Sequence, residues 1–178
     1  QVRLLHELIL AALFIGTSLI NVQAQPQVDT LEQVNPYPIE SDFNISADLQ
    51  NPAWKNAKSA FIKYQVQPND NVKAHVDTEV KVLYSDENLY IAFINEDPTP
   101  QDIRANISDR DNGFQDDYVG VFLDPFNNNQ QAYELFVNPL GIQMDGMRMG
   151  NSEDMNFDML WYSDGKITES GYQSVMNI

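Results

Sequence analysis

From residue 43 onward, the apolar positions fall in short runs separated by clusters of Asn, Asp, Gly and Pro. In residues 78–84, Val80, Val82 and Tyr84 fall on one face of an extended chain, and Glu79 and Lys81 fall on the other. Alternation at period two is typical of a β-strand with one buried face. Comparable runs predict the other strands at residues 60–66, 89–93, 118–123, 132–137, 141–145, 160–162, 166–168 and 171–178.

Many short strands joined by turn residues predict an all-β fold, an immunoglobulin-like or jelly-roll-type β-sandwich. We expect it to be C-terminally truncated, because the strand that begins at Gly171 is still running at Ile178. The almost wholly apolar run 118–123 predicts a central strand buried on both faces, and residues 163–165 predict a turn. A single helical turn is predicted within residues 51–60, where Pro52 could occupy the first helical position.

The first 24 residues follow the pattern of an export signal. Arg3 supplies a basic start, residues 8–20 form an uncharged apolar run, and residues 22–24 (Val-Gln-Ala) give the small-x-small pattern that signal peptidase reads. A spanning helix needs about 20 apolar residues and this run is shorter, which favours the signal peptide; an N-terminal membrane anchor is the alternative interpretation. We predict a signal peptide at 1–24, a polar, proline-containing linker at 25–42 and one domain at 43–178.

Composition narrows the classes of partner. The chain has 178 residues, 10 basic and 26 acidic side chains, a net charge of -16 and no cysteine. This charge repels phosphate backbones and argues against a nucleic-acid partner. The lack of cysteine excludes a disulfide scaffold, a thiolate zinc site and a cysteine nucleophile. It also fits an exported protein of a Gram-negative bacterium, in the periplasm, the outer membrane or outside the cell.

Several short motifs follow one another in a fixed order along residues 43–178. They are Asn51-Pro52-Ala53-Trp54, residues 78–92, Asp109-Arg110-Asp111, Asp116-Asp117-Tyr118-Val119, Phe122-Leu123-Asp124-Pro125, residues 136–145, residues 157–161 and Gly171-Tyr172. Together they resemble the carbohydrate-binding module family 9-like domain, in the form found N-terminal to a long region of unknown function in exported Bacteroidota-type proteins. Three places depart from the family pattern: Ser46-Ala47 stands where the family has Asp-Gly, Tyr172 where it has Trp and Val175 where it has Glu.

The resemblance implies a β-sandwich that binds a carbohydrate ligand and is associated with carbohydrate catabolism by a protein with hydrolase activity on O-glycosyl compounds. It also implies a downstream region of the same chain as a partner, with no transmembrane span after signal cleavage. The chain itself is expected to be non-catalytic, because no motif nominates a facing pair of carboxylates. The alternative is a structural β-sandwich module that has lost sugar binding and docks on a downstream outer-membrane region.

Sugar recognition needs a flat aromatic face and side chains that hydrogen-bond to hydroxyl groups. We predict Trp161 as the stacking face, and the alternative is a core tryptophan of the sandwich. The predicted polar partners are Arg110, Asn138, Gln143 and Asp145, with Arg104 and Arg148 as further hydroxyl donors.

The densest polar cluster, residues 109–117, suggests calcium as a cofactor. Asp109, Asp111 and Asp116 would supply the hard oxygen ligands that calcium prefers. The EF-hand template fails, because Gly113 and Gly120 stand at its fifth and twelfth positions. The alternative is a solvated acidic loop.

Overall fold

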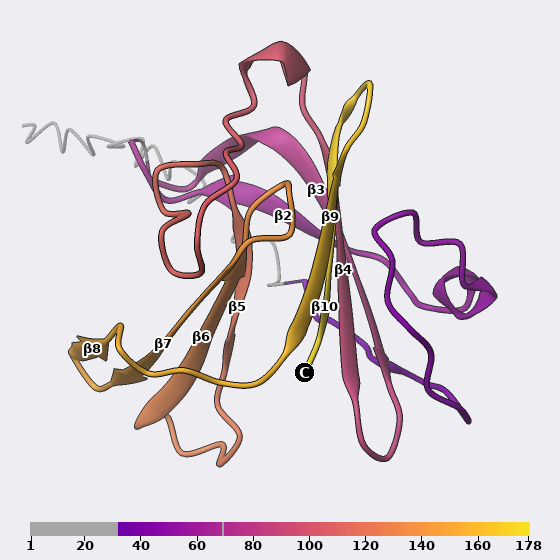
Figure 1. Cartoon of the computed structure of the whole chain (residues 1–178), viewed down its shortest axis with the longest axis vertical. Coiled ribbons are helices and arrows are strands. Elements are labelled where there is room, and N and C mark those ends of the chain that lie inside the picture. The colour runs from indigo at the N-terminus through magenta and orange to yellow at the C-terminus, as the bar shows by residue number, and fades with distance from the viewer. Residues whose placement is uncertain (1–31, 69) are drawn as a thin grey trace, which may run out of the picture. The chain divides into compact units, whose positions relative to one another are not determined.

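The computed structural model describes residues 32–68 and 70–178, so the predicted signal peptide lies outside the described residues. The described chain is a two-sheet β-sandwich, as the alternating pattern predicts (Figure 1). Its strands are β1 (Tyr37–Pro38), β2 (Ala60–Gln65), β3 (Val72–Tyr84), β4 (Leu89–Glu96), β5 (Val119–Leu123), β6 (Gln131–Val137), β7 (Gln143–Met149), β8 (Ser152–Asp154), β9 (Tyr162–Ile167) and β10 (Gly171–Asn177). Two short 3-10 turns, η1 (Pro52–Lys55) and η2 (Pro100–Asp102), are the helical elements. Within this part of the chain, no helix is long and apolar enough to cross a membrane.

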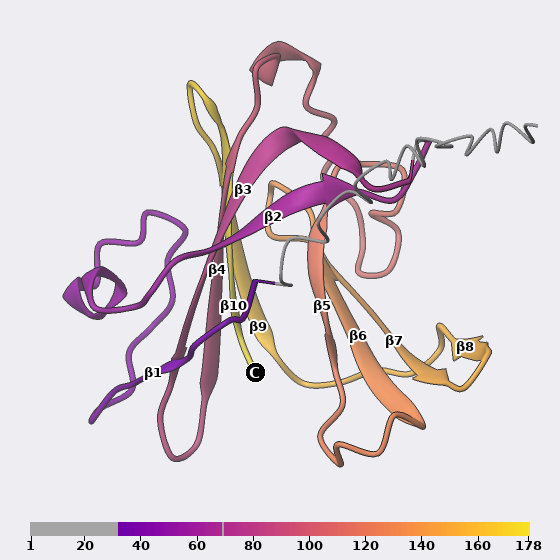
Figure 2. The same cartoon turned by 180° about the vertical axis from the view of Figure 1, so that it is seen from behind.

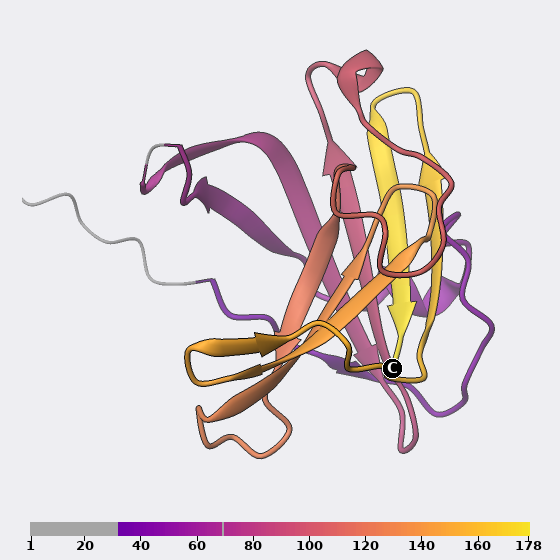
Figure 3. The ribbon, with the colours of Figure 1, turned by 60° about the vertical axis from the view of Figure 1, so that its left-hand side comes forward.

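The six-stranded sheet has the order β1-β3-β4-β10-β9, with β2 paired to β3 on the same side as β1. All its pairs are antiparallel except β1 with β3. The β3–β4 hairpin turns at residues 85–88, where the Oγ of Ser85 accepts from the backbone N–H groups of Glu87 and Asn88. In Figure 3, the distal part of the β2–β3 ribbon bends away from the rest of this sheet.

The four-stranded sheet has the order β5-β6-β7-β8, all antiparallel. β5 is therefore an edge strand, and the prediction of a central strand at 118–123 is wrong. Only its inward residues, such as Val119, reach the core, whereas Phe122 on the outer face is 55% exposed. The outer face of β5 carries aromatic side chains that no other part of the described chain covers. The run 118–123 is therefore apolar on both faces although only one face is buried.

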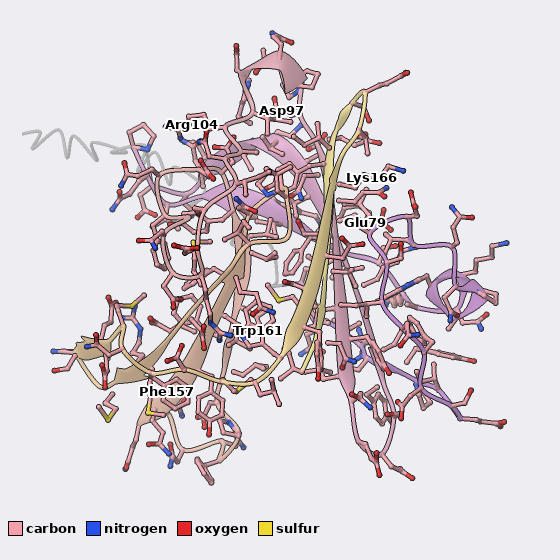
Figure 4. The ribbon with its side chains drawn as sticks, in the orientation of Figure 1. Glu79, Asp97, Arg104, Phe157, Trp161 and Lys166 are labelled. Atoms are coloured by element: carbon pink, nitrogen blue, oxygen red, sulfur yellow. The ribbon has the colours of Figure 1, made fainter. Side chains whose placement is uncertain are left out.

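The main core lies between the sheets, built from alternate residues of both. Val80, Phe93, Leu135 and Met176 belong to it. Trp161 belongs to it as well and is only 2% exposed, so the core interpretation holds for this residue and its ring offers no face to a ligand. Figure 4 shows Trp161 between the two sheets.

A second apolar cluster covers the other face of the six-stranded sheet. Leu83, Tyr90 and Val175 point away from the main core and pack against residues 39–57, which cross that face (Figure 2). The predicted helical turn is confirmed in η1, where the Asn51 side chain accepts a hydrogen bond from the Ala53 N–H. The last residues of the predicted linker join the sheet as β1.

Other sequence predictions differ from the structure as well. Only Tyr162 of the predicted strand 160–162 lies in a strand, as the first residue of β9. The turn predicted at 163–165 lies inside β9, because Gly165 is needed there for close approach: an added Cβ would sit 2.3 Å from the Gly141 nitrogen. β3 is six residues longer at its start than the run 78–84, along the exposed ribbon where both faces meet solvent. The short strand β8 is polar, with all three residues exposed, so no apolar pattern signals it.

Candidate functional site

Three of the five predicted sugar-binding residues meet beside β7. Arg110 Nε lies 2.9 Å from Oδ1 of the buried Asp145, and Arg110 Nη1 lies 3.1 Å from Oε1 of Gln143. The Gln143 amide donates to the carbonyl of Trp161, and Asp145 Oδ2 accepts from the N–H of Met159. These polar groups satisfy one another and fix two loops to the edge of β7.

The carboxylates predicted to bind calcium do not form one group. Among the described residues, one set of three acidic side chains has oxygens within 4.8 Å of one another, and it consists of Asp111, Asp145 and Asp158. The Arg110 guanidinium lies among them, with Nε 3.9 Å from Asp111 and 3.6 Å from Asp158. The positive charge that faces these three carboxylates is therefore the guanidinium of Arg110. Neither Asp109 nor Asp116 belongs to the set.

Asp116 and Asn138 form a separate buried network. Asp116 accepts hydrogen bonds from the backbone N–H of Asn106 at 2.8 Å, from its side chain at 2.6 Å and from Asn138 Nδ2 at 2.9 Å. Asn138 Oδ1 accepts from the N–H groups of Leu140 and Ile142, and so closes the β6–β7 turn. Both polar groups of the Asn138 side chain are thus occupied within the fold.

A cleft of about 520 Å³ adjoins this network, where the free edge of β5 faces β3, β4 and β10. It is lined by charged, aromatic, aliphatic and uncharged polar side chains. The lining residues are Ile62, Val76, Thr78, Asn95, Asp97, Arg104, Asp116, Asp117, Tyr118, Val119, Gly120, Phe136 and Tyr172. Pockets of this size with a few converging polar groups are the usual form of small-ligand sites.

The floor of the cleft is a row of three polar side chains on neighbouring strands. Thr78 of β3 is opposite Asn95 of β4, and Asn95 is opposite Tyr172 of β10. The Thr78 hydroxyl donates to Asn95 Oδ1 at 2.8 Å, and Asn95 Nδ2 donates to the Tyr172 carbonyl at 3.3 Å. These contacts hold the asparagine amide in one orientation at the base of the cleft.

Tyr172 brings a hydroxyl to this floor. The residue is only 6% exposed, and within residues 32–68 and 70–178 its hydroxyl has no hydrogen-bond partner. Burial raises the pKa of Tyr172, and the negative charges of Asp117 and Asp97 raise it further. The hydroxyl therefore stays protonated and is available to bind a polar ligand.

Aromatic rings line another side of the cleft. Tyr118 is 44% exposed and packs edge-to-face on Phe136, with ring centroids 5.5 Å apart. The Phe136 ring can cross β5 because Gly120 has no side chain: an added Cβ would lie 2.2 Å from the ring. The wall therefore presents one rigidly supported, accessible tyrosine.

Charged groups line the rim. Arg104 donates its backbone N–H to Asp117 Oδ2 at 2.9 Å, and its guanidinium lies 3.4 Å from Oδ1 of the same residue. Figure 4 places Arg104 and Asp97 at the same end of the domain. Arg104 is the one cationic side chain among the lining residues.

The residue pattern predicts Arg104 as a hydroxyl donor, but it does not predict the floor of the cleft. A signal was present: Ile91 and Phe93 are inward residues of β4, and Asn95 is the next inward position. On β3, Thr78 likewise continues the inward series of Val80 and Val82. A polar residue at the next inward position of a strand therefore indicates where the two sheets separate.

Comparisons with known proteins agree with this architecture. The family model described as carbohydrate family 9 binding domain-like matches residues 45–175. A candidate carbohydrate-binding protein from Bacteroides uniformis has a similar structure, with a TM-score of 0.55 at 10% identity, over 82% of this chain and 73% of that one. A family 9 carbohydrate-binding module from Caldicellulosiruptor kristjanssonii, solved with cellotriose, gives a TM-score of 0.52 at 15% identity, over 81% of this chain and 67% of that one. No curated protein matches the chain. By the match over residues 45–175, the chain belongs to the carbohydrate family 9 binding domain-like family.

Proposed function

We propose that this domain binds a carbohydrate ligand in the cleft between β5 and the ends of β3, β4 and β10. The observation that carries the proposal is the polar row Thr78, Asn95 and Tyr172 below an accessible tyrosine ring. A pyranose has an apolar face for the ring of Tyr118 and hydroxyl groups for the Tyr172 hydroxyl and the Arg104 guanidinium. Family membership supports the same ligand class.

Calorimetric titration of the described domain with cello-oligosaccharides tests this proposal. Tyr118→Ala should weaken binding by more than about fivefold, since truncating a central interface tyrosine typically costs over 1 kcal/mol. Tyr162→Ala is the matched control, because Tyr162 is also an exposed tyrosine but does not line the cleft. Equal affinities of the two variants would contradict the proposed site.

For the whole protein, we propose export and a role in the breakdown of O-glycosyl polysaccharides. The support is the apolar run 8–20 followed by Val-Gln-Ala at 22–24, together with the absence of cysteine. N-terminal sequencing of the mature protein should begin at Gln25. An intact apolar run in the mature protein would favour the membrane anchor instead.

Docking as a structural module is the second candidate function. It is favoured by apolar side chains on the β2–β3 ribbon, namely Phe61, Ile62, Val66 and Val72, all of which are exposed. Large exposed apolar patches often mark contact surfaces. If docking is the function, calorimetric titration of the domain should show no heat of binding with any glycan. Val66→Ser should then improve the solubility of the isolated domain.

A further inference from the structure

The charge of the cleft suggests which carbohydrates it accepts. Three carboxylates, Asp97, Asp116 and Asp117, line it against the single guanidinium of Arg104. Asp117 is paired with Arg104 through both oxygens. Asp116 is occupied on both oxygens by Asn106 and Asn138. The remaining carboxylate, Asp97, is the one whose charge has least compensation.

Asp97 is held in place by one oxygen and leaves the other available. Its Oδ1 accepts from the Thr99 N–H at 2.7 Å and from the Thr99 hydroxyl at 3.1 Å. In the part of the chain that the structure describes, Oδ2 receives no hydrogen bond and no ion pair. A fixed carboxylate with an unoccupied oxygen at the rim of a ligand cleft is an acceptor site for a cationic or hydroxyl donor.

The negative potential also reaches the floor. The charges of Asp117 and Asp97 both act on the hydroxyl of Tyr172, which lines the cleft. A ligand seated on this floor therefore lies in the field of the same two carboxylates. An anionic sugar there meets like charge, and a sugar that carries an ammonium group meets opposite charge.

We infer that the cleft selects glycans by charge, favouring amino sugars that carry an ammonium group over neutral sugars and excluding uronic acids. This inference rests on the proposed carbohydrate function of the same cleft. Asp97 is its specificity-determining residue, because it lines the cleft with one carboxylate oxygen unbonded, while both oxygens of Asp116 and Asp117 are already bonded within the described residues. The overall net charge of -16 adds a weaker, longer-range attraction of the same sign.

Four β-1,4-linked trisaccharides separate charge from shape: those of glucose, glucosamine, N-acetylglucosamine and glucuronic acid. Calorimetry is done at mildly acidic pH, where the glucosamine amines are protonated, and at low and high salt. The glucosamine trisaccharide should bind at least about fivefold more tightly than the glucose trisaccharide at low salt, and the glucuronic acid trisaccharide should bind more weakly than both. High salt should reduce these differences in affinity between the charged and the neutral trisaccharides, because it screens the charges. The N-acetylglucosamine trisaccharide carries no ammonium group, so it should not show the tighter binding expected for the glucosamine trisaccharide.

Asp97→Asn is the decisive variant, because its side-chain oxygen can still accept from Thr99 while the charge is removed. It should reduce the preference for glucosamine over glucose by at least about threefold. Asp86→Asn is the control, with the same change of charge on an exposed turn residue outside the cleft.

The outcomes distinguish the two claims. Binding of the glucose trisaccharide with no preference for the amine would overturn charge selection and leave the proposed function standing. An Asp86→Asn variant that narrows the preference as much as Asp97→Asn would also overturn it, since overall charge would then be the cause. No binding of any of the four sugars would overturn the proposed function together with the inference.

Discussion

Arg110 forms a partly buried ion pair with Asp145, with Nε 2.9 Å from Oδ1. Asp145 is fully buried and its Oδ2 accepts from the Met159 N–H at 2.7 Å, while Arg110 Nη2 donates to the Met159 carbonyl at 2.7 Å. One pair of side chains therefore ties the loop before β5 and the segment before β9 to strand β7. Its role in this structure is to hold the fold together.

Removing the arginine should strongly destabilise the domain. Arg110→Met leaves the Asp145 carboxylate buried without its partner, which typically costs about 3–5 kcal/mol. Urea denaturation measures the loss in the free energy of unfolding. Arg104→Met is the control, because its pair with Asp117 is solvent-exposed and worth about 0–1 kcal/mol. Similar losses in the two variants would contradict a structural role specific to Arg110.

Much of the fold could be predicted from the sequence because burial on one face imposes a period of two. The alternation of Val80 and Val82 with charged residues identifies β3, and the run that begins at Leu89 identifies β4. The pattern could not place β5 at a sheet edge, because Phe122 belongs to an outward-facing aromatic cluster rather than to the core. Hydrophobicity alone does not say which apolar faces are covered.

The candidate site was less predictable, because residue type does not reveal which partners a polar side chain meets. Arg110, Gln143 and Asp145 do come together, as predicted, but they bond to one another and to backbone groups. Nothing in the sequence distinguishes Asn95 from other polar residues. Only the register of the strands places it between Thr78 and Tyr172. Contacts between strands distant in sequence decide the floor of the cleft.

The burial of Trp161 predicts a loss of stability on truncation. Trp161→Ala should cost about 3–5 kcal/mol of unfolding free energy, as expected for removing a large core side chain. Trp161→Phe should cost much less, because it keeps a ring in the core and removes the Nε1–H, which is buried without a hydrogen-bond partner. Thermal or urea unfolding of both variants checks this. A Trp161→Ala variant of normal stability with lost sugar affinity would restore Trp161 as the stacking face.

Gly171 is required by close approach to β4. A Cβ at this position would lie 1.9 Å from the Asn95 carbonyl oxygen, so Gly171→Ala must displace either β4 or β10. We expect a loss of about 3 kcal/mol and a weaker ligand affinity, because Asn95 and Tyr172 shift with those strands. Gly150→Ala is the control: its φ is +58° but no atom lies within 4 Å of the added Cβ. Backbone strain alone should then cost about 1 kcal/mol.

The Asp116 network predicts that acid destabilises the domain. Burial raises the pKa of the Asp116 carboxyl, but hydrogen bonds from Asn106 and Asn138 and the charge of Arg104 outweigh this and hold its pKa below the ordinary value of 3.8. The folded state therefore binds a proton less readily than the unfolded chain does. The stabilisation is complete above the unfolded pKa and is lost as the pH falls through the lower, folded pKa.

Asp116→Asn isolates this contribution. The variant should be less stable than the wild type at neutral pH, since an amide cannot accept all three hydrogen bonds, and its stability should fall less steeply as the pH drops below about 4. Asp42 and Asp124 also have lowered pKa values, owing chiefly to the Ser85 hydroxyl and the Asn129 N–H respectively, so part of the acid dependence will remain. Urea midpoints measured from neutral to acidic pH give the slope. An Asp116→Asn slope as steep as that of the wild type would mean that Asp116 is not held ionised by its buried partners, and that the lining of the cleft is less rigid than these hydrogen bonds imply.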